Sequence, residues 1–440
     1  MPAAALLAAS LGCGSDGDPP PPADRVDGGA PGPDAGPPPA SPVEVVALEI
    51  VDGLGSDALL GDPLDLVVAP SGAPAVVYGA APVGSGERWI RYAERTGEDT
   101  WAVEDAVRPG AQAQTQGELL ALSAAVWGGT VHMAYQGGDD DGVATSQFPT
   151  DLVLATRGGT GDWSERILVD TSGEAAADCP DNQNTCNVGN VVGAHAALAV
   201  GPGDVQAVAY RDTHFGFAVD DFELADAELW VSDGPPVAVD FERGGGLWGN
   251  VGFLPDGRVV MVYAIETDRH PGIWLWLEGA PALVRVAERP TVHRVGLAVA
   301  DDGTVWLAWF DPAADDLVVA SASGDLGAWT TERVDQSGSV GLHPDIALGA
   351  DGQPRVVYGY CGSSASRDCP FDPGSQAEVR MARRLSDGTW RIDTLDDGEG
   401  RGGVGFFNRL VALPGGRWGV AFQDARNLDV LFALVEEPGS

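Results

Sequence analysis

Short apolar segments separated by tight turns make up most of the chain. From about residue 44 onward one unit recurs: a strand of small aliphatic residues, a turn with glycine, a second strand that closes on an aromatic residue, and two further strands. Turns such as Asp302-Gly303 and Asp351-Gly352 suit hairpins in which the backbone takes a positive φ. Helical periodicity is nearly absent. The pattern therefore predicts an all-β protein built from four-stranded units.

The aromatic residue of the second strand marks seven copies of this unit. These residues are Tyr78, Tyr135, Tyr210, Tyr263, Trp309, Tyr358 and Phe422. Fourth strands are marked in four of the units by Trp101, Trp163, Trp329 and Trp390. Seven four-stranded units predict a seven-bladed β-propeller. In that fold each blade buries its faces against its neighbours, so a long chain folds without one oversized core.

The two ends of the repeat region complement each other. The last unit ends after its third strand, at residues 429–435, whereas the region opens with an unpaired apolar segment at 43–53. That segment ends in Glu-Ile-Val-Asp-Gly, similar to the fourth strands of other units. We expect residues near 48 to pair with residues near 432. This pairing closes the ring and removes two open sheet edges.

Two turns between third and fourth strands resemble the Asp-boxes of sialidase-like propellers. They read SGDLGAW at 323–329 and SDGTW at 386–390. The resemblance implies the propeller fold, because such turns are structural in that family. The family's activity is not implied, since the chain has no segment similar to the Phe-Arg-Ile-Pro of working sialidases.

The start of the chain resembles a bacterial lipoprotein signal. A short apolar run leads to Leu11-Gly12-Cys13, and the resemblance implies a signal at 1–13 with Cys13 lipidated. Residues 14–43 are rich in Pro, Gly and Asp, which predicts a disordered tether before a propeller at 44–440. The resemblance therefore implies an exported protein that is anchored in the outer membrane or at the cell surface only through lipid. No Lys or Arg precedes the run, so a nonspecific alanine-rich leader stays an alternative.

The remaining cysteines form two close pairs. Cys179 and Cys186 enclose one short loop, and Cys361 and Cys369 enclose another. Such spacing predicts local disulfides in an oxidising compartment. A metal–thiolate site is less consistent with the sequence, because neither pair has Cys-x-x-Cys spacing.

Charge narrows the range of partners. The 440 residues carry a net charge of −40, and every basic side chain is arginine. Repulsion from phosphate argues against nucleic acid, and the balance favours cations, basic partners or neutral sugars. Nearly all long insertions fall at 136–151, 171–192, 211–226 and 359–377, on one predicted face of the propeller. This elaborated face is the expected working surface.

A calcium site is the only cofactor that the loops suggest, and no other is expected. Oxygen donors cluster in one acidic loop, but no EF-hand-like motif is present, and most acidic loops stay solvated. The weak candidates are Asp178, Asp181, Asn182 and Asn184.

Histidines and aspartates recur at similar places in several units. His195, His293 and His343 precede first strands, where Asn250 and Asn408 stand in other units. An acid follows two residues after the aromatic in three units. We expect the histidine and the aspartate positions to lie near the channel mouth on the elaborated face. Their side chains could be ligands of a metal or a sugar, or they could brace the loop backbone. Their repetition favours the bracing role. The ligand-binding candidates are His195, His293, His343, Asp212, Asp311, Asp424, Tyr360 and Asn408.

No catalytic residue is assigned. The chain lacks Gly-x-Ser-x-Gly and His-Glu-x-x-His motifs, and its carboxylates are too numerous to single out a pair. Phe215, Phe217, Trp230 and Trp248 could stack on sugar rings or pack in the core. A monomeric surface propeller that binds a protein or glycan is the favoured hypothesis. A glycoside hydrolase or polysaccharide lyase, with acids and histidines at the channel mouth, is the alternative, and a structural envelope component is a third.

Overall fold

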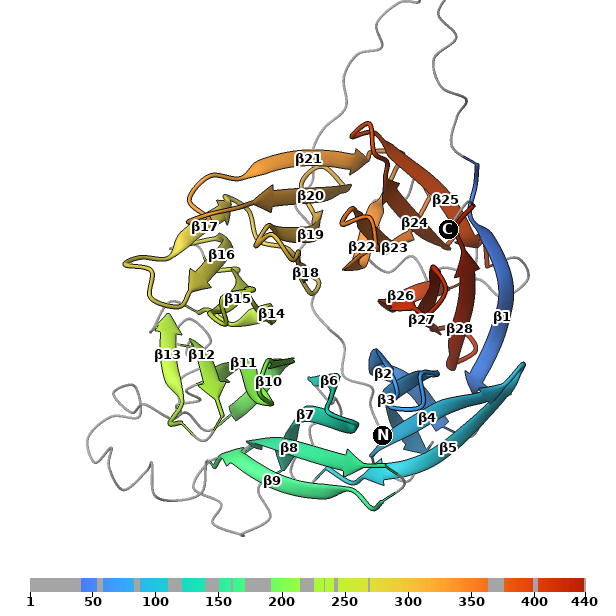
Figure 1. Ribbon diagram of the computed structural model, residues 1–440, viewed down its shortest axis with the longest axis horizontal. Helices are drawn as coiled ribbons and strands as arrows, with labels where there is room; N and C mark the ends of the chain where they lie inside the picture. The colour runs from blue at the N-terminus through green and yellow to red at the C-terminus, as the bar shows by residue number, and fades with distance from the viewer. Residues whose placement is uncertain are drawn as a thin grey trace, which may run out of the picture. The chain divides into compact units, whose positions relative to one another are not determined.

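The computed structural model describes the chain in thirteen stretches, all within the repeat region. They are 41–53, 58–82, 88–109, 121–138, 150–159, 161–170, 191–213, 225–232, 234–240, 244–267, 270–362, 376–398 and 403–438. These residues form strands β1 to β28, which are arranged as seven blades around a central axis (Figure 1). In the described stretches no helix is long and apolar enough to cross a membrane.

The first four blades follow the chain in order. Blade 1 contains β2 (Ala58–Val68), β3 (Pro74–Pro82), β4 (Trp89–Gly97) and β5 (Thr100–Val107). Blade 2 contains β6 (Leu122–Trp127), β7 (Thr130–Gly138), β8 (Thr150–Gly158) and β9 (Ser164–Val169). Blade 3 contains β10 (Val191–Gly201), β11 (Val205–Thr213), β12 (Asp226–Val231) and β13 (Val237–Asp240). Blade 4 contains β14 (Leu247–Phe253), β15 (Val259–Ile265), β16 (Gly272–Leu277) and β17 (Val284–Ala287).

The last three blades complete the ring. Blade 5 contains β18 (Gly296–Val299), β19 (Val305–Asp311), β20 (Asp316–Ala322) and β21 (Thr330–Asp335). Blade 6 contains β22 (Val340–Leu348), β23 (Pro354–Tyr360), β24 (Glu378–Arg384) and β25 (Trp390–Asp396). Blade 7 contains β26 (Val404–Leu413), β27 (Arg417–Asp424), β28 (Asp429–Glu436) and β1 (Glu44–Asp52). The first strand of each of blades 1 to 6, and β26 in blade 7, lies nearest the axis (Figure 1).

The ring closes as the sequence predicts. β1 pairs antiparallel with β28, with Leu48 opposite Ala433 and Glu49 opposite Phe432. The segment that opens the repeat region therefore supplies the fourth strand of the last blade. The seven-bladed, all-β prediction is confirmed.

The second-strand aromatic residues lie in the core between blades. All seven are buried, because the second strand is covered on both faces. In three blades the tyrosine hydroxyl donates to an aspartate that ends the fourth strand of the preceding blade. These pairs are Tyr78 with Asp52 at 2.7 Å, Tyr263 with Asp240 at 2.8 Å and Tyr358 with Asp335 at 2.8 Å. A buried hydrogen bond thus joins neighbouring blades.

The two turns that resemble Asp-boxes connect third to fourth strands at the outer part of blades 5 and 6. The carboxylate of Asp325 accepts the Gly327 amide at 3.0 Å. In the other turn, Asp387 accepts the amide of Thr389 at 2.9 Å and its hydroxyl at 2.7 Å. Both aspartates stabilise their own turns, and the family assignment itself stays a resemblance.

Candidate functional site

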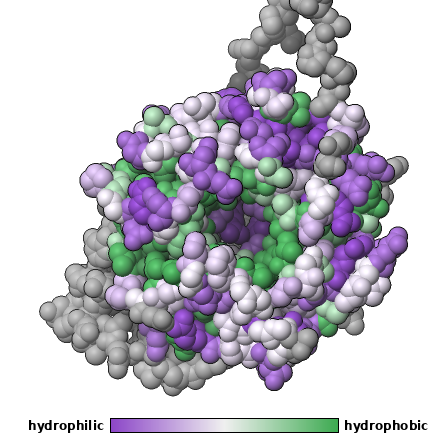
Figure 2. All heavy atoms as spheres, viewed as in Figure 1, coloured by the Kyte–Doolittle hydropathy of each residue, from purple (hydrophilic) through white to green (hydrophobic). Residues whose placement is uncertain are grey.

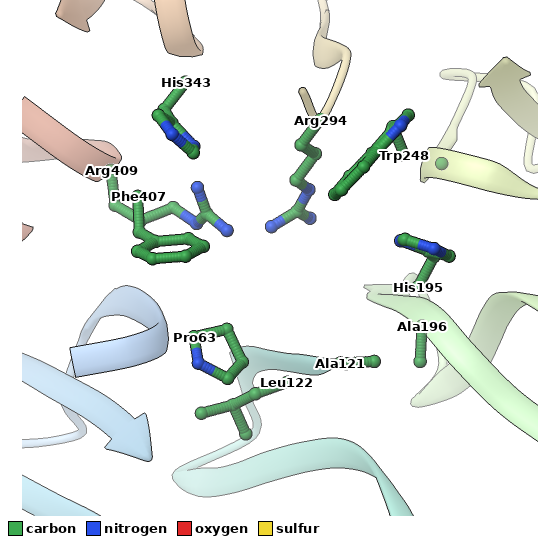
Figure 3. Close-up of a pocket in the computed structure, with 11 residues that line it drawn as sticks. Pro63, Ala121, Leu122, His195, Ala196, Trp248, Arg294, His343, Phe407 and Arg409 are labelled. Carbon is green, nitrogen blue, oxygen red and sulfur yellow. The ribbon is translucent and has the colours of Figure 1, made fainter. Parts of the chain in front are cut away.

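A pocket of about 520 Å³, counting its open mouth, occupies one end of the central channel. Its lining comes from the innermost strands of blades 1 to 4, 6 and 7 and from the segment just before β18 in blade 5 (Figure 3). Figure 2 shows the hollow on the axis, with hydrophilic residues inside and hydrophobic residues around it. Inner strands begin at this end, which is also where the blade-to-blade connections enter.

Four of the residues that line the pocket share the same unusual backbone conformation. His195, Trp248, His343 and Phe407 all have positive φ, between 47° and 54°. Each sits at an irregularity in the pairing of its inner strand with the second strand. A glycine with positive φ stands two residues earlier in each case, at Gly193, Gly246, Gly341 and Gly405. The extra residues of such a bulge turn a side chain out of the sheet and toward the channel.

These side chains form two pairs across the pocket. The rings of His195 and Trp248 meet edge to face with centroids 4.5 Å apart. The rings of His343 and Phe407 lie 4.9 Å apart, tilted by 51°. Burial, and to a smaller extent the charge of Arg211, lowers the pKa of His195 to about 3. Burial also holds the pKa of His343 well below its usual value. Both imidazoles are therefore uncharged at neutral pH and act as aromatic walls.

Two arginines enter the pocket between these pairs. Arg294 precedes β18 and Arg409 lies on β26, and their guanidinium groups point toward one another (Figure 3). Arg409 donates from Nε to the carboxylate of Asp65 at 3.1 Å, and Arg294 donates from Nη2 to Oδ1 of Asn250 at 3.2 Å. Both cations are thus oriented by polar groups of the inner strands. The side of the pocket formed by Pro63, Ala121 and Leu122 is apolar.

A belt of polar contacts on the inner strands supports the arginines. Asp65 accepts the Ala124 amide of the next blade at 2.8 Å and the hydroxyl of Ser123 at 3.1 Å. The hydroxyl of Ser123 in turn accepts the amide of Leu198, one blade further on, at 3.1 Å. Side chains of one blade therefore fix the backbone of the next, and Asp65 joins this belt to Arg409.

Asp345 makes the corresponding contact between blades 6 and 7. Its Oδ2 accepts the amide of Leu410 at 2.8 Å. Burial raises the pKa of Asp345, although the charges of Arg409 and Arg294 oppose that rise. Asp65 and Asp345 thus lie close enough to the two arginines to balance part of their charge without lining the pocket.

The structure places the predicted histidines at the channel mouth but assigns them unequal positions. His195 and His343 line the pocket. His293 stacks on His343 with ring centroids 4.0 Å apart and does not line it. Among the described residues, no group of three or more His, Cys, Asp or Glu could hold a metal ion. The hypothesis of a shared three-histidine metal site therefore finds no support in that part of the chain.

The sequence suggested that Asn250 and Asn408 take the same place in their blades as the histidines take in others. The structure shows that they do not. The bulges align Trp248 and Phe407 with His195 and His343. Asn408 is buried and donates from Nδ2 to the carbonyls of Leu342, His343 and Gly405, at 2.9 to 3.3 Å. It braces two bulges of neighbouring blades. The predicted equivalence was wrong because, at each bulge, the asparagine follows the side chain that enters the pocket by one or two residues.

The predicted acids at the ends of second strands do not enter the pocket. Asp424 accepts the amides of Arg426 and Asn427 in the turn that follows β27. Asp311 accepts the amide of Ala313 at 3.0 Å in the corresponding turn of blade 5. Asp212 is buried at the end of β11.

Tyr360 also has a local partner. The guanidinium of Arg380 lies over its ring, 3.5 Å from the centroid. Tyr360 does not line the pocket.

Several predicted residues lie outside the described stretches. They are Cys13, the calcium candidates Asp178, Asp181, Asn182 and Asn184, and Cys179, Cys186 and Cys369. Cys361 is described: it is buried and disulfide-bonded. Its pairing with Cys369 stays a prediction, as do the second disulfide, the lipid anchor and the calcium site.

The sequence analysis missed Arg294, Arg409 and Phe407. A signal for the bulges was present, because a glycine precedes the pocket residue by two positions in Gly-Ala-His195, Gly-Leu-Trp248, Gly-Leu-His343 and Gly-Phe-Phe407. The arginines carried no such signal. The negative net charge of the chain gave no indication of two cations at the channel mouth.

Comparisons with known proteins concern the fold. No protein-family model matches the chain, and no curated protein matches it. A protein of unknown function from Dyadobacter fermentans is similar in structure, with 11% identity, coverage of 90% of this chain and 99% of that one, and a TM-score of 0.48. An α-L-arabinanase from Penicillium chrysogenum gives 13% identity, 91% and 99% coverage and a TM-score of 0.45. The Hadza microbial sialidase Hz136 gives 13% identity, 80% and 73% coverage and 0.44.

Proposed function

We propose that this protein is an exported, surface-displayed propeller that binds a glycan by taking one sugar unit into the channel-mouth pocket. The observation that carries the proposal is the pairing of aromatic walls, from Trp248 and Phe407, with hydrogen-bond donors from Arg294 and Arg409. Ligand sites of this kind are mostly apolar, with a few convergent polar groups. Sugar rings stack on aromatic faces while their oxygens accept hydrogen bonds.

The shape of the pocket favours a glycan over a protein partner. The site is recessed between inner strands of different blades, so a flat protein surface cannot reach the guanidinium groups. The end of a glycan chain can. The described lining residues include no aspartate or glutamate, so we propose binding rather than hydrolysis, which needs two carboxylates placed on either side of the bond.

The register of blade 7 shows at which end of the channel the described chain begins. β26 starts at the pocket and ends at Leu413, which pairs with Arg417. Arg417 pairs with Glu436, and Glu436 pairs with Glu44. The chain therefore enters the propeller at the end of the channel opposite the pocket.

Replacement of Trp248 by alanine tests the proposal. We expect the wild-type protein to bind members of an immobilised glycan panel, and Trp248→Ala to bind about tenfold more weakly because stacking area is lost, since tenfold corresponds to about 1.4 kcal/mol. Trp127→Ala is the matched control. Trp127 is exposed at the far end of β6, and its loss should leave binding unchanged. Wild-type protein that binds no glycan, or equal losses in both variants, would contradict the proposal.

A further inference from the structure

The pocket is cationic in a chain of strongly negative net charge. The sequence carries 65 acidic and 25 basic residues, yet the charged side chains among the described residues that line the pocket are Arg294 and Arg409. Their guanidinium groups face one another across the channel (Figure 3). Two like charges held together in a partly buried site repel each other, so the arrangement needs a compensating charge.

Among the described residues, Asp65 and Asp345 compensate these charges from behind, without lining the pocket. Arg409 donates to Asp65 from Nε and to the carbonyl of Asn408 from Nη1 at 2.8 Å. Arg294 donates from Nη2 to Asn250, and its Nη1 lies 3.9 Å from Asp65. Asp65 is already committed, because it also accepts hydrogen bonds from blades 1 and 2.

Arg294 keeps an unused donor. Its Nε is buried and has no hydrogen-bond partner among the described residues. Burial lowers the pKa of Arg294, and the charge of Arg409 lowers it further. A buried cationic donor without a partner is costly, and a negative charge bound beside the guanidinium group would offset part of that cost.

We propose that the pocket binds a single oxyanionic group between Arg294 and Arg409. Guanidinium forks match the oxygens of carboxylates and sulfates, and these charge-assisted hydrogen bonds strengthen where water is excluded. Trp248 and Phe407 flank the two cations, so a ring that carries the anion lies against them. The occupant is an acidic sugar unit, which rests on the proposed function, or a free oxyanion, which does not.

Titration calorimetry on the full chain separates these sources. Glucuronate, glucose and sulfate are titrated in turn at low salt. We expect glucuronate to bind at least tenfold more tightly than glucose and sulfate to compete with it. Sulfate that binds when glucuronate does not would support the oxyanion site and assign it to a free anion.

Arg294→Gln tests the assignment to this residue, with Arg258→Gln as the control. Arg258 lies on the exposed turn before β15 and contacts Asp256. We expect Arg294→Gln to weaken glucuronate binding at least tenfold, Arg294→Lys to retain part of it, and Arg258→Gln to leave it unchanged. Thermal unfolding of each variant identifies loss of fold. If Arg294→Gln does not fold, sulfate competition in the wild-type protein decides.

The outcomes also separate this inference from the proposed function. Glucose and glucuronate that bind equally well, with no effect of Arg294→Gln, would overturn the oxyanion site and leave glycan binding standing. Sulfate binding without any glycan binding would do the reverse. Absence of all binding would overturn both.

Discussion

At the scale of single residues, the shape of the pocket depends on glycines that do not line it. Gly341 has a φ of +93°, and a Cβ there would lie 2.8 Å from the Cα of Leu317 in the preceding blade. Gly246 has the same relation to Arg211, at 2.9 Å. The inner strand therefore passes close to its neighbour only because no side chain is present. Two residues later the backbone turns His343 or Trp248 toward the axis.

Gly341→Ala should be far more damaging than a glycine replacement in an open turn. We expect a loss of about 2–3 kcal/mol in the free energy of unfolding, because alanine is strained at this φ and collides with backbone. Gly352→Ala is the comparison: its φ is +71°, but nothing lies within 4 Å of the added Cβ. That variant should lose only about 1 kcal/mol. Urea unfolding measures both, and equal losses would refute the close-approach argument.

At the scale of elements, blades are joined by an aspartate that ends one fourth strand and a tyrosine of the next blade. Asp335 accepts the hydroxyl of Tyr358 at 2.8 Å and pairs with Arg380 at 3.2 Å. Burial raises the pKa of Asp335, but hydrogen bonds from Ser337 and Tyr358 and the charge of Arg380 lower it more, so the pKa lies below its usual value. A depressed folded-state pKa means that the carboxylate stabilises the fold above a pH of about 4 and loses this contribution as the pH falls.

Asp335→Asn should therefore destabilise the protein in a pH-dependent way. At pH 7 we expect a loss of about 2 kcal/mol, because the amide cannot pair with Arg380 and matches the buried donors poorly. Near pH 3 the difference from wild type should shrink, since the wild-type carboxylate is losing its charge. Urea unfolding at both pH values measures it, with the exposed Asp301→Asn as control. An undiminished difference near pH 3 would argue against the ionised pair.

At the scale of the whole molecule, the ring depends on a strand from the far end of the sequence. β1 presents alternate faces, with Val51 buried at 4% exposure and Ile50 exposed at 42%. Val51 packs in the same core cluster as Val430, Phe432 and Leu434 of β28. The inward face of β1 thus closes blade 7 against blade 1, and its outward face contributes little.

Val51→Asp and Ile50→Asp separate these two faces. A carboxylate at Val51 would be buried without a partner, so we expect a loss of more than about 3 kcal/mol and partial opening of the ring. Ile50→Asp should cost less than about 0.5 kcal/mol, because surface substitutions rarely cost more. Thermal unfolding gives the stabilities, and size-exclusion chromatography detects association through the exposed β28 edge. A tolerated Val51→Asp would mean that β1 is not needed for closure.

Sequence alone determined the fold of this protein and the path of its closure. Strand periodicity, the repeated aromatic residues and the fourth-strand endings are local patterns, because each blade is built from consecutive residues, and they placed Leu48 opposite the strand that holds Ala433. Sequence also placed His195 and His343 near the channel mouth, although they lie within the first strands β10 and β22 and not before them as expected.

Only the tertiary structure decided the chemistry of the pocket. Arg294 and Arg409 are 115 positions apart along the chain. They meet because the innermost parts of blades 5 and 7 lie around the same axis. The bulges moved Asn250 and Asn408 into bracing positions and put Trp248 and Phe407 beside the arginines. The net charge is a sum over all side chains of the protein, whereas a binding site is formed by the few side chains that the ring of blades brings together. For that reason the acidity of the chain did not predict the cations at its centre.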